Sequence, residues 1–129
     1  ELIAKLLADP DVHEKADILL IGDRHLFEMG QTQAGTETEM VACDANKGDW
    51  TDISGLAIHE RETIAADDVR LAEVTYANGH SALSNLNCAL EMARDGIIDA
   101  ITFGPFNKAA LIEAGLMRPL DPIVLRWGH

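Results

Sequence analysis

Residues 99–111 read DAITFGPFNKAAL, and this stretch decides the fold class. The apolar run over residues 97–103 predicts a strand, the Gly-Pro pair after it predicts a tight turn, and the residues from Asn107 onward favour a helix. A strand, a turn and a helix N-terminus in this order are typical of an α/β sheet. Ligands of such sheets bind beyond the carboxyl ends of the strands, where helix N-termini present free N–H groups.

Asn107 and Lys108 stand where this helix is expected to begin. An amide and an ammonium group at that place suit an anionic, oxygen-rich ligand, so both are candidate substrate-binding residues. The alternative is structural, with Asn107 capping the helix and Lys108 exposed to solvent. The pattern alone leaves both interpretations open.

The segments before this stretch extend the α/β pattern. Apolar residues recur at intervals of three and four over residues 79–94 and predict the longest helix, with Asn78 or Ser81 as its cap and Gly96 near its end. The continuous apolar run over residues 16–22 predicts a strand buried on both faces of a parallel sheet. Further elements are expected as helices at residues 2–7, stopped by Pro10, and at 24–34, as short strands at 40–43 and 56–59, and as a short amphipathic segment at 65–73.

Length and charge argue against several classes of protein. The chain of 129 residues carries 22 acidic against 10 basic side chains, and its net charge of −12 repels nucleic acid and anionic membranes. No apolar run approaches the roughly 20 residues of a membrane helix, and the first residues do not resemble a signal peptide, so we expect a cytoplasmic protein. Cys43 and Cys88 lack C-x-x-C spacing and are expected as buried thiols in a reducing compartment.

Local motifs for metals and dinucleotides are missing. The acidic residues between 37 and 52 do not follow the calcium-loop pattern, and His59 with Glu60 and Glu62 lacks the second histidine of a zinc helix. No G-x-G-x-x-G occurs. A nicotinamide enzyme with this sequence would therefore not use the usual fingerprint.

The run GPFNKAAL at residues 104–111, followed by Ala114 and Gly115, resembles the (A/G)-P-x-N-K-x-x-L…A-G signature of one enzyme family. It is the 4-hydroxythreonine-4-phosphate dehydrogenase family of pyridoxal phosphate biosynthesis, with its sugar-acid-phosphate relatives. ELIAKLLADP at residues 1–10 and ADILLIGDR at 16–24 look like the family's first helix, second strand and following turn. ANGH at residues 77–80 resembles the start of its long crossover helix.

The resemblance implies a fold, an activity and an assembly. The expected fold is α/β, a three-layer αβα arrangement with a mostly parallel sheet, as a fragment of an isocitrate/isopropylmalate dehydrogenase-like fold. Residues 1–129 would be a single partial domain, the N-terminal subdomain of a larger dehydrogenase. Family members oxidise 4-hydroxythreonine-4-phosphate or a related sugar-acid phosphate with NAD or NADP, followed by decarboxylation. They use a divalent metal (Zn, Mg or Co) and a cleft completed by the second subunit of a homodimer.

The resemblance fails beyond Gly115 and before Glu1. The family continues to a G-H-T-E motif that touches substrate, whereas residues 116–129 read LMRPLDPIVLRWGH. His129 is either the first half of that motif, and hence a candidate substrate-binding residue, or a chance terminal residue. The family's three metal-binding histidines lie further downstream and its glycine-rich G-D-P-A-G-x-G-P turn lies upstream, so no catalytic or metal-binding residue is assigned here.

Two other interpretations remain open from the sequence. A truncated remnant of such an enzyme would be a non-catalytic domain that oligomerises or binds a partner through apolar surface left by the missing part. An unrelated, small flavodoxin-like binding domain would require the match at residues 104–111 to be accidental.

Overall fold

The computed structural model describes residues 1–71, 73–103 and 108–115. Within them three short parallel strands form one sheet in the order β1-β3-β2. Their bounds are β1 Leu19–Gly22, β2 Met40–Cys43 and β3 Leu56–Glu60. Leu19 lies opposite Ala57, and Met40 lies opposite Leu56. The expected mostly parallel α/β sheet is therefore confirmed.

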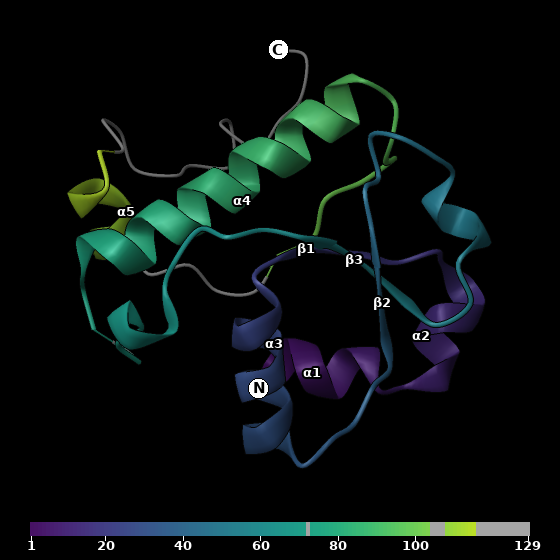
Figure 1. Cartoon of the computed structure of the whole chain (residues 1–129), viewed down its shortest axis with the longest axis horizontal. Helices are drawn as coiled ribbons and strands as arrows, with labels where there is room; N and C mark the ends of the chain where they lie inside the picture. Colours follow the sequence, from purple (N-terminus) through teal and green to yellow (C-terminus); the bar gives the residue numbers. More distant parts are fainter. Residues whose placement is uncertain (72, 104–107, 116–129) are drawn as a thin grey trace.

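Helices lie on both faces of the sheet. Figure 1 shows the strands between the long helix α4 (Tyr76–Arg94) on one side and α1 (Leu2–Leu7) with α3 (Arg24–Ala34) on the other. The central strand β3 is buried, and a hydrophobic cluster of Ala4, Leu7, Phe27 and Leu56 joins it to α1 and α3. This is the layered arrangement that the sequence predicts. None of the helices in the described residues is long and apolar enough to cross a membrane.

Short elements complete the described chain. They are α2 (Pro10–Lys15), the 3-10 turns η1 (Trp50–Asp52) and η2 (Ala66–Asp68), and α5 (Lys108–Glu113). Pro10 begins α2, where the missing proline N–H costs nothing, and Asp9 caps that helix by accepting from the Asp11 N–H at 2.9 Å. The predicted stop at Pro10 is therefore a helix start, since α1 has already ended at Leu7. Of the amphipathic segment predicted at residues 65–73, the described residues are helical only over η2.

The ends of α4 correct one prediction and confirm another. The Thr75 hydroxyl accepts from the Asn78 N–H at 3.1 Å, so Thr75 is the cap and not Asn78 or Ser81. At the other end Gly96 adopts φ 77°, and the Ile97 N–H reaches the Met92 carbonyl at 2.9 Å. A glycine in the left-handed region is the usual residue at this place in a helix C-terminus.

Gly79 lets α5 pack directly on α4. A Cβ added at Gly79 would lie 1.8 Å from the carbonyl oxygen of Ala110, far inside van der Waals contact. Ala110 and Leu111 of α5 are themselves buried. The absence of a side chain at Gly79 therefore fixes how closely the two helices approach.

The strand predicted at residues 97–103 does not form. The Ile97 N–H closes the end of α4, and the Ile97 carbonyl accepts the indole N–H of Trp50 at 3.1 Å. The backbone N–H and C=O of Ile97 are thus hydrogen-bonded outside any sheet. Within the described residues no strand pairs with this segment, and β1 has a partner only on its β3 side. Apolar sequence was therefore insufficient for a strand here, because a strand needs a ladder partner.

Candidate functional site

The predicted substrate-binding residues lie at the border of the described chain. Lys108 is the first residue of α5, as the sequence predicts, but its side chain is outside the described part. Asn107 and His129 also lie outside the described residues. Their roles in substrate binding therefore stay predictions.

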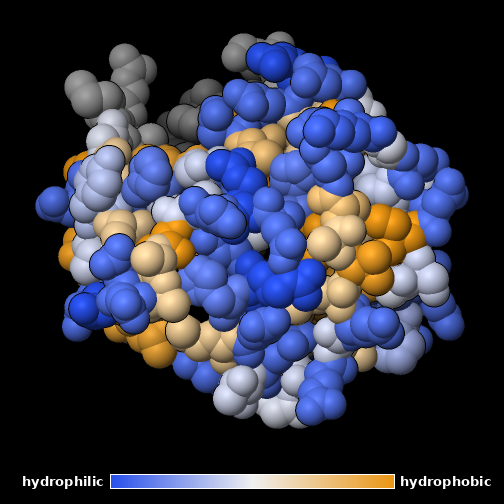
Figure 2. All heavy atoms as spheres, viewed as in Figure 1, coloured by the Kyte–Doolittle hydropathy of each residue, from blue (hydrophilic) through white to orange (hydrophobic). Residues whose placement is uncertain are grey.

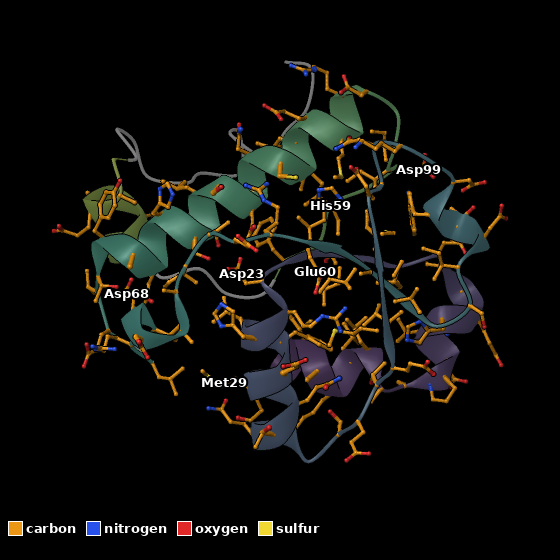
Figure 3. All side chains as sticks on the ribbon, viewed as in Figure 1. Asp23, Met29, His59, Glu60, Asp68 and Asp99 are labelled. Carbon is orange, nitrogen blue, oxygen red and sulfur yellow. The ribbon has the colours of Figure 1, made fainter. Side chains whose placement is uncertain are left out.

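The described residues gather polar side chains at the carboxyl edge of the sheet. Asp23 follows β1, whereas Arg61 and Thr63 follow β3. Because β1 and β3 are parallel neighbours, these residues meet at one edge, and α4 covers it with Ser81 and Ser84. Figure 3 shows Asp23 and Glu60 close to each other in this part of the molecule.

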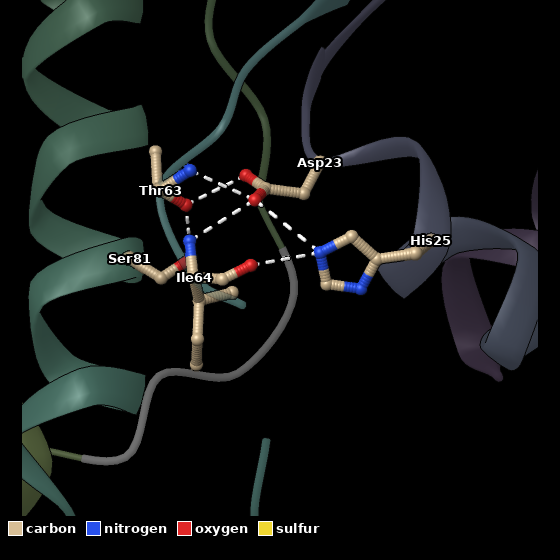
Figure 4. A network of polar contacts seen from close by, with 5 residues as sticks. All are labelled: Asp23, His25, Thr63, Ile64 and Ser81. Carbon is tan, nitrogen blue, oxygen red and sulfur yellow. Dashed lines mark hydrogen bonds and ion pairs between the residues drawn. The ribbon is translucent and has the colours of Figure 1, made fainter. Parts of the chain in front are cut away.

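Asp23 is the centre of a buried hydrogen-bond network (Figure 4). Its side chain is 1% exposed, and its Oδ2 accepts from the backbone N–H groups of Thr63 at 2.8 Å and Ile64 at 3.1 Å. Its Oδ1 accepts from the Thr63 hydroxyl at 2.6 Å. That hydroxyl lies 2.6 Å from the Ser81 Oγ, and since its own proton goes to the carboxylate, Ser81 is the donor. The network ties β1, the loop after β3 and α4 together.

His25 adds a titratable group to this network. Its Nε2 lies 2.9 Å from the Ile64 carbonyl oxygen and 3.5 Å from the Asp23 Oδ2. Both partners are acceptors, so Nε2 carries the proton. The other ring nitrogen, Nδ1, is buried and has no hydrogen-bond partner among the described residues. His25 therefore braces the loop after β3 from the side of α3.

Two arginines at this edge have different surroundings. Arg24 forms an ion pair with Glu60. Arg61 donates its backbone N–H to the Gly22 carbonyl at 2.9 Å and its guanidinium Nη2–H to the Ser84 hydroxyl at 2.6 Å. Within the described residues, Arg61 forms no ion pair.

No metal centre fits the described residues, in which no group of three or more His, Cys, Asp or Glu side chains lies together. His59, at the end of β3, accepts the Ala45 N–H on Nδ1 at 3.2 Å and lies 3.9 Å from Asp44. His13 contacts the Leu7 carbonyl, and His80 stacks on Tyr76. These contacts are structural, and we derive no metal-dependent step from them.

The cysteines are less buried than expected. Cys43 and Cys88 are free thiols, and both are half-buried. Burial, with a smaller contribution from the neighbouring Asp44 carboxylate, raises the pKa of the Cys43 thiol. A raised pKa lowers the thiolate fraction at neutral pH, so Cys43 is a poor nucleophile.

Two hollows of the described surface lie away from this edge. One, of about 470 Å³, lies at the amino ends of the strands between Leu7, Ile18 and Leu56. The other, of about 500 Å³, lies along α4 and is lined by Leu86, Leu90, Ala93, Asp99, Ala100, Ile101 and Phe103. Neither is lined by Asp23 or Arg61. Figure 2 instead shows hydrophilic side chains gathered around a small hollow near the centre of the face drawn there.

The sequence did not identify Asp23, Thr63, Ser81 and Arg61 as site residues. One signal was available for Asp23, because it directly follows the apolar run at residues 16–22, where a parallel strand was expected to end. The others lack such a signal, since their proximity depends on strand pairing and on the crossing of α4.

Comparison with known proteins places this geometry in a family. Residues 14–120 match the family model described as pyridoxal phosphate biosynthetic protein PdxA. A relative from Pseudomonas aeruginosa, named putative 4-hydroxythreonine-4-phosphate dehydrogenase 2, is 40% identical over 117 residues, which cover 90% of this chain and 34% of the relative. A protein of the same name from Rhizobium meliloti is 40% identical over 115 residues, covering 86% of this chain and 32% of that protein. The chain thus spans about a third of the length of these curated relatives.

A solved structure supports the same assignment. The crystal structure of a 4-hydroxythreonine-4-phosphate dehydrogenase from Burkholderia phymatum superposes with a TM-score of 0.82 at 26% identity. The superposition covers 96% of this chain and 37% of that one. The likeness of fold and the family-model match therefore agree. This chain belongs to the PdxA family of pyridoxal phosphate biosynthetic proteins.

Proposed function

We propose that the polypeptide carrying this chain oxidises a phosphorylated hydroxy acid with NAD or NADP. The substrate would be 4-hydroxythreonine-4-phosphate or a related sugar-acid phosphate, and decarboxylation would follow oxidation. The observation that carries this proposal is the family match over residues 14–120, together with the dehydrogenase names of the relatives. This chain, as a partial domain of a larger homodimeric enzyme, would supply one wall of the substrate cleft.

In this proposal the chain's own residues bind and orient the substrate. Lys108 contributes positive charge toward the phosphate or carboxylate of the substrate, and Asn107 donates one hydrogen bond and orients the turn before α5. His129 contributes a second polar contact. The cofactor would accept the hydride that leaves the substrate, because protein side chains do not serve as hydride acceptors. Since the described residues do not form a metal site, metal ligands would have to come from elsewhere in the polypeptide or its partner.

The first experiment is the intact mass of the natural polypeptide, followed by a reduction assay. With 4-hydroxythreonine-4-phosphate, NAD or NADP and Mg²⁺, Zn²⁺ or Co²⁺, we expect absorbance at about 340 nm to rise, as for nicotinamide reduction. Absence of reduction with every combination of cofactor and metal, both for 4-hydroxythreonine-4-phosphate and for related sugar-acid phosphates, would refute the dehydrogenase function.

The role of Lys108 is tested in the same assay. Lys108→Ala should lower kcat/KM at least about tenfold, or about 1.4 kcal/mol in transition-state binding. Lys15→Ala is the matched control, because Lys15 is exposed and has the same charge. An unchanged kcat/KM in Lys108→Ala would remove the residue from substrate binding while leaving the dehydrogenase function in place.

A second function is favoured by exposed apolar side chains. Leu2, Leu6, Leu71 and Tyr76 are between 50% and 65% exposed, and large apolar side chains that gather in a surface patch mark interaction sites. A non-catalytic domain that uses such surface for association would form oligomers in a concentration-dependent manner. Sedimentation velocity over a hundredfold range of concentration, with no nicotinamide reduction, would support this function over the first.

A further inference from the structure

We propose that Arg61 is the binding residue for a phosphate-type oxyanion at the carboxyl edge of the sheet. The arginine is held at two points. Its backbone N–H bonds to the end of β1 at Gly22, and its guanidinium bonds to Ser84 of α4. An arginine fixed at both ends loses little side-chain entropy when it binds a ligand.

The carboxylates near Arg61 do not pair with it. Glu60 pairs with Arg24, and Asp23 accepts hydrogen bonds from two backbone N–H groups and one hydroxyl. Glu62 is exposed and forms no ion pair within the described residues. The remaining N–H donors of the Arg61 guanidinium therefore meet no carboxylate in the part of the chain that the structure describes.

This arrangement is unusual for a chain of net charge −12. Acidic residues outnumber basic ones by two to one, so an arginine placed at random would readily find a carboxylate. Arg61 is also half-buried, and a partly desolvated charge without a counter-charge is unfavourable. An external anion would relieve this cost.

The groups around Arg61 suit a small oxyanion with polar substituents. Asn85 follows Ser84 on α4, and a Cβ added at Gly22 would lie 3.6 Å from its amide nitrogen. The Asn85 Oδ1 is buried and has no hydrogen-bond partner among the described residues. Asn85 therefore lies beside the end of β1 with an unused acceptor, whereas the donors for an oxyanion come from the Arg61 guanidinium.

The ligand class is a phosphate group, which a planar guanidinium binds with several charge-assisted hydrogen bonds. Its identification with the substrate's phosphate rests on the proposed function. The binding of an oxyanion to Arg61 does not, because it requires neither a nicotinamide cofactor nor turnover.

The test measures binding of inorganic phosphate to the natural polypeptide by calorimetry, with acetate as a carboxylate at equal ionic strength. Arg61→Gln should raise the Kd for phosphate at least about tenfold, which is about 1.4 kcal/mol. Arg61→Lys, which keeps the charge and loses the planar fork, and Ser84→Ala, which releases the guanidinium, should each raise it severalfold. Arg94→Gln is the matched control, because Arg94 is an exposed arginine at the far end of α4.

Outcomes separate the proposal from its alternatives. Circular dichroism first checks that each variant is folded. If Arg61→Gln does not fold, Ser84→Ala and Arg61→Lys still test the proposal. Equal losses in Arg61→Gln and Arg94→Gln would mean a general charge effect and would overturn the proposal. Equal affinity for acetate and phosphate would overturn the assignment to phosphate. Retained phosphate binding in a polypeptide without nicotinamide reduction would refute the proposed function and leave the Arg61 site in place.

Discussion

Removal of the Asp23 carboxylate tests the network that holds the carboxyl edge together. Asp23→Ala leaves the backbone N–H groups of Thr63 and Ile64 without an acceptor, because Oδ2 accepts both of them. The Thr63 hydroxyl is less affected, since it can turn toward Ser81, 2.6 Å away. Two backbone donors, the buried Ile64 N–H and the partly buried Thr63 N–H, are therefore left unsatisfied.

The magnitude follows from these contacts. A buried donor left without a partner costs about 1–3 kcal/mol, so two of them predict a loss of about 4 kcal/mol in the free energy of unfolding. Asp23→Asn keeps one oxygen for the two N–H groups and points its amide toward the Thr63 hydroxyl, which is able to accept. Only the charge assistance is lost, and we expect a cost of about 1–2 kcal/mol.

Urea denaturation followed by circular dichroism measures both values, with the slope m checked for a change in the unfolded state. Asp67→Ala is the control, since Asp67 is exposed, and it should stay within about 0.5 kcal/mol of the wild type. A loss below about 1 kcal/mol in Asp23→Ala would refute the reasoning, because the donors would then be satisfied in some other way. Equal losses in the two Asp23 variants would show that charge, and not geometry, dominates.

Three further predictions concern packing and ionisation. Gly79→Ala should lower the free energy of unfolding by about 3 kcal/mol, despite alanine's better helix propensity, because the new Cβ overlaps the α5 backbone. Urea denaturation measures this loss, and Gly48→Ala is the control because a Cβ at Gly48 meets open space. Hydrogen bonds from the Thr51 hydroxyl and N–H lower the pKa of Asp49. The contribution of Asp49 to folding stability is therefore present at neutral pH and lost as pH falls through the folded-state pKa. Thr51→Val should raise that pKa in an NMR titration. Burial raises the pKa of Cys43, so its contribution to stability is lost as pH rises through the folded-state pKa, and iodoacetamide at about pH 8 should alkylate it more slowly than an unstructured cysteine peptide.

Elements with strong local patterns were predictable from sequence. The helix at Arg24–Ala34 and the strand at Met40–Cys43 have the predicted bounds, and β3 is one residue longer than predicted. The structure of residues 97–103 was not predictable, although this segment is as apolar as the strands that form. Its first residue, Ile97, hydrogen-bonds to the end of α4 and to Trp50, and neither contact is visible from local sequence.

The candidate site was only partly predictable for the same reason. Asp23 and Thr63 are 40 residues apart, and only the parallel pairing of β1 with β3 brings them within 2.8 Å. Ser81 joins them because α4 crosses the same edge. Lys108 was placed correctly at the start of α5, but the contacts of its side chain stay a prediction.

The buried acid and the arginine at this edge have complementary consequences for an anionic ligand. Asp23 would repel a phosphate if its charge faced outward. Its oxygens instead accept hydrogen bonds from the loop after β3, so its charge stabilises that loop and its side chain is 1% exposed. Glu60 is likewise neutralised by Arg24. Because Asp23 and Glu60 have these partners, neither pairs with Arg61, and the guanidinium charge is available to a phosphorylated ligand at the proposed site, in a chain whose net charge of −12 opposes anion binding.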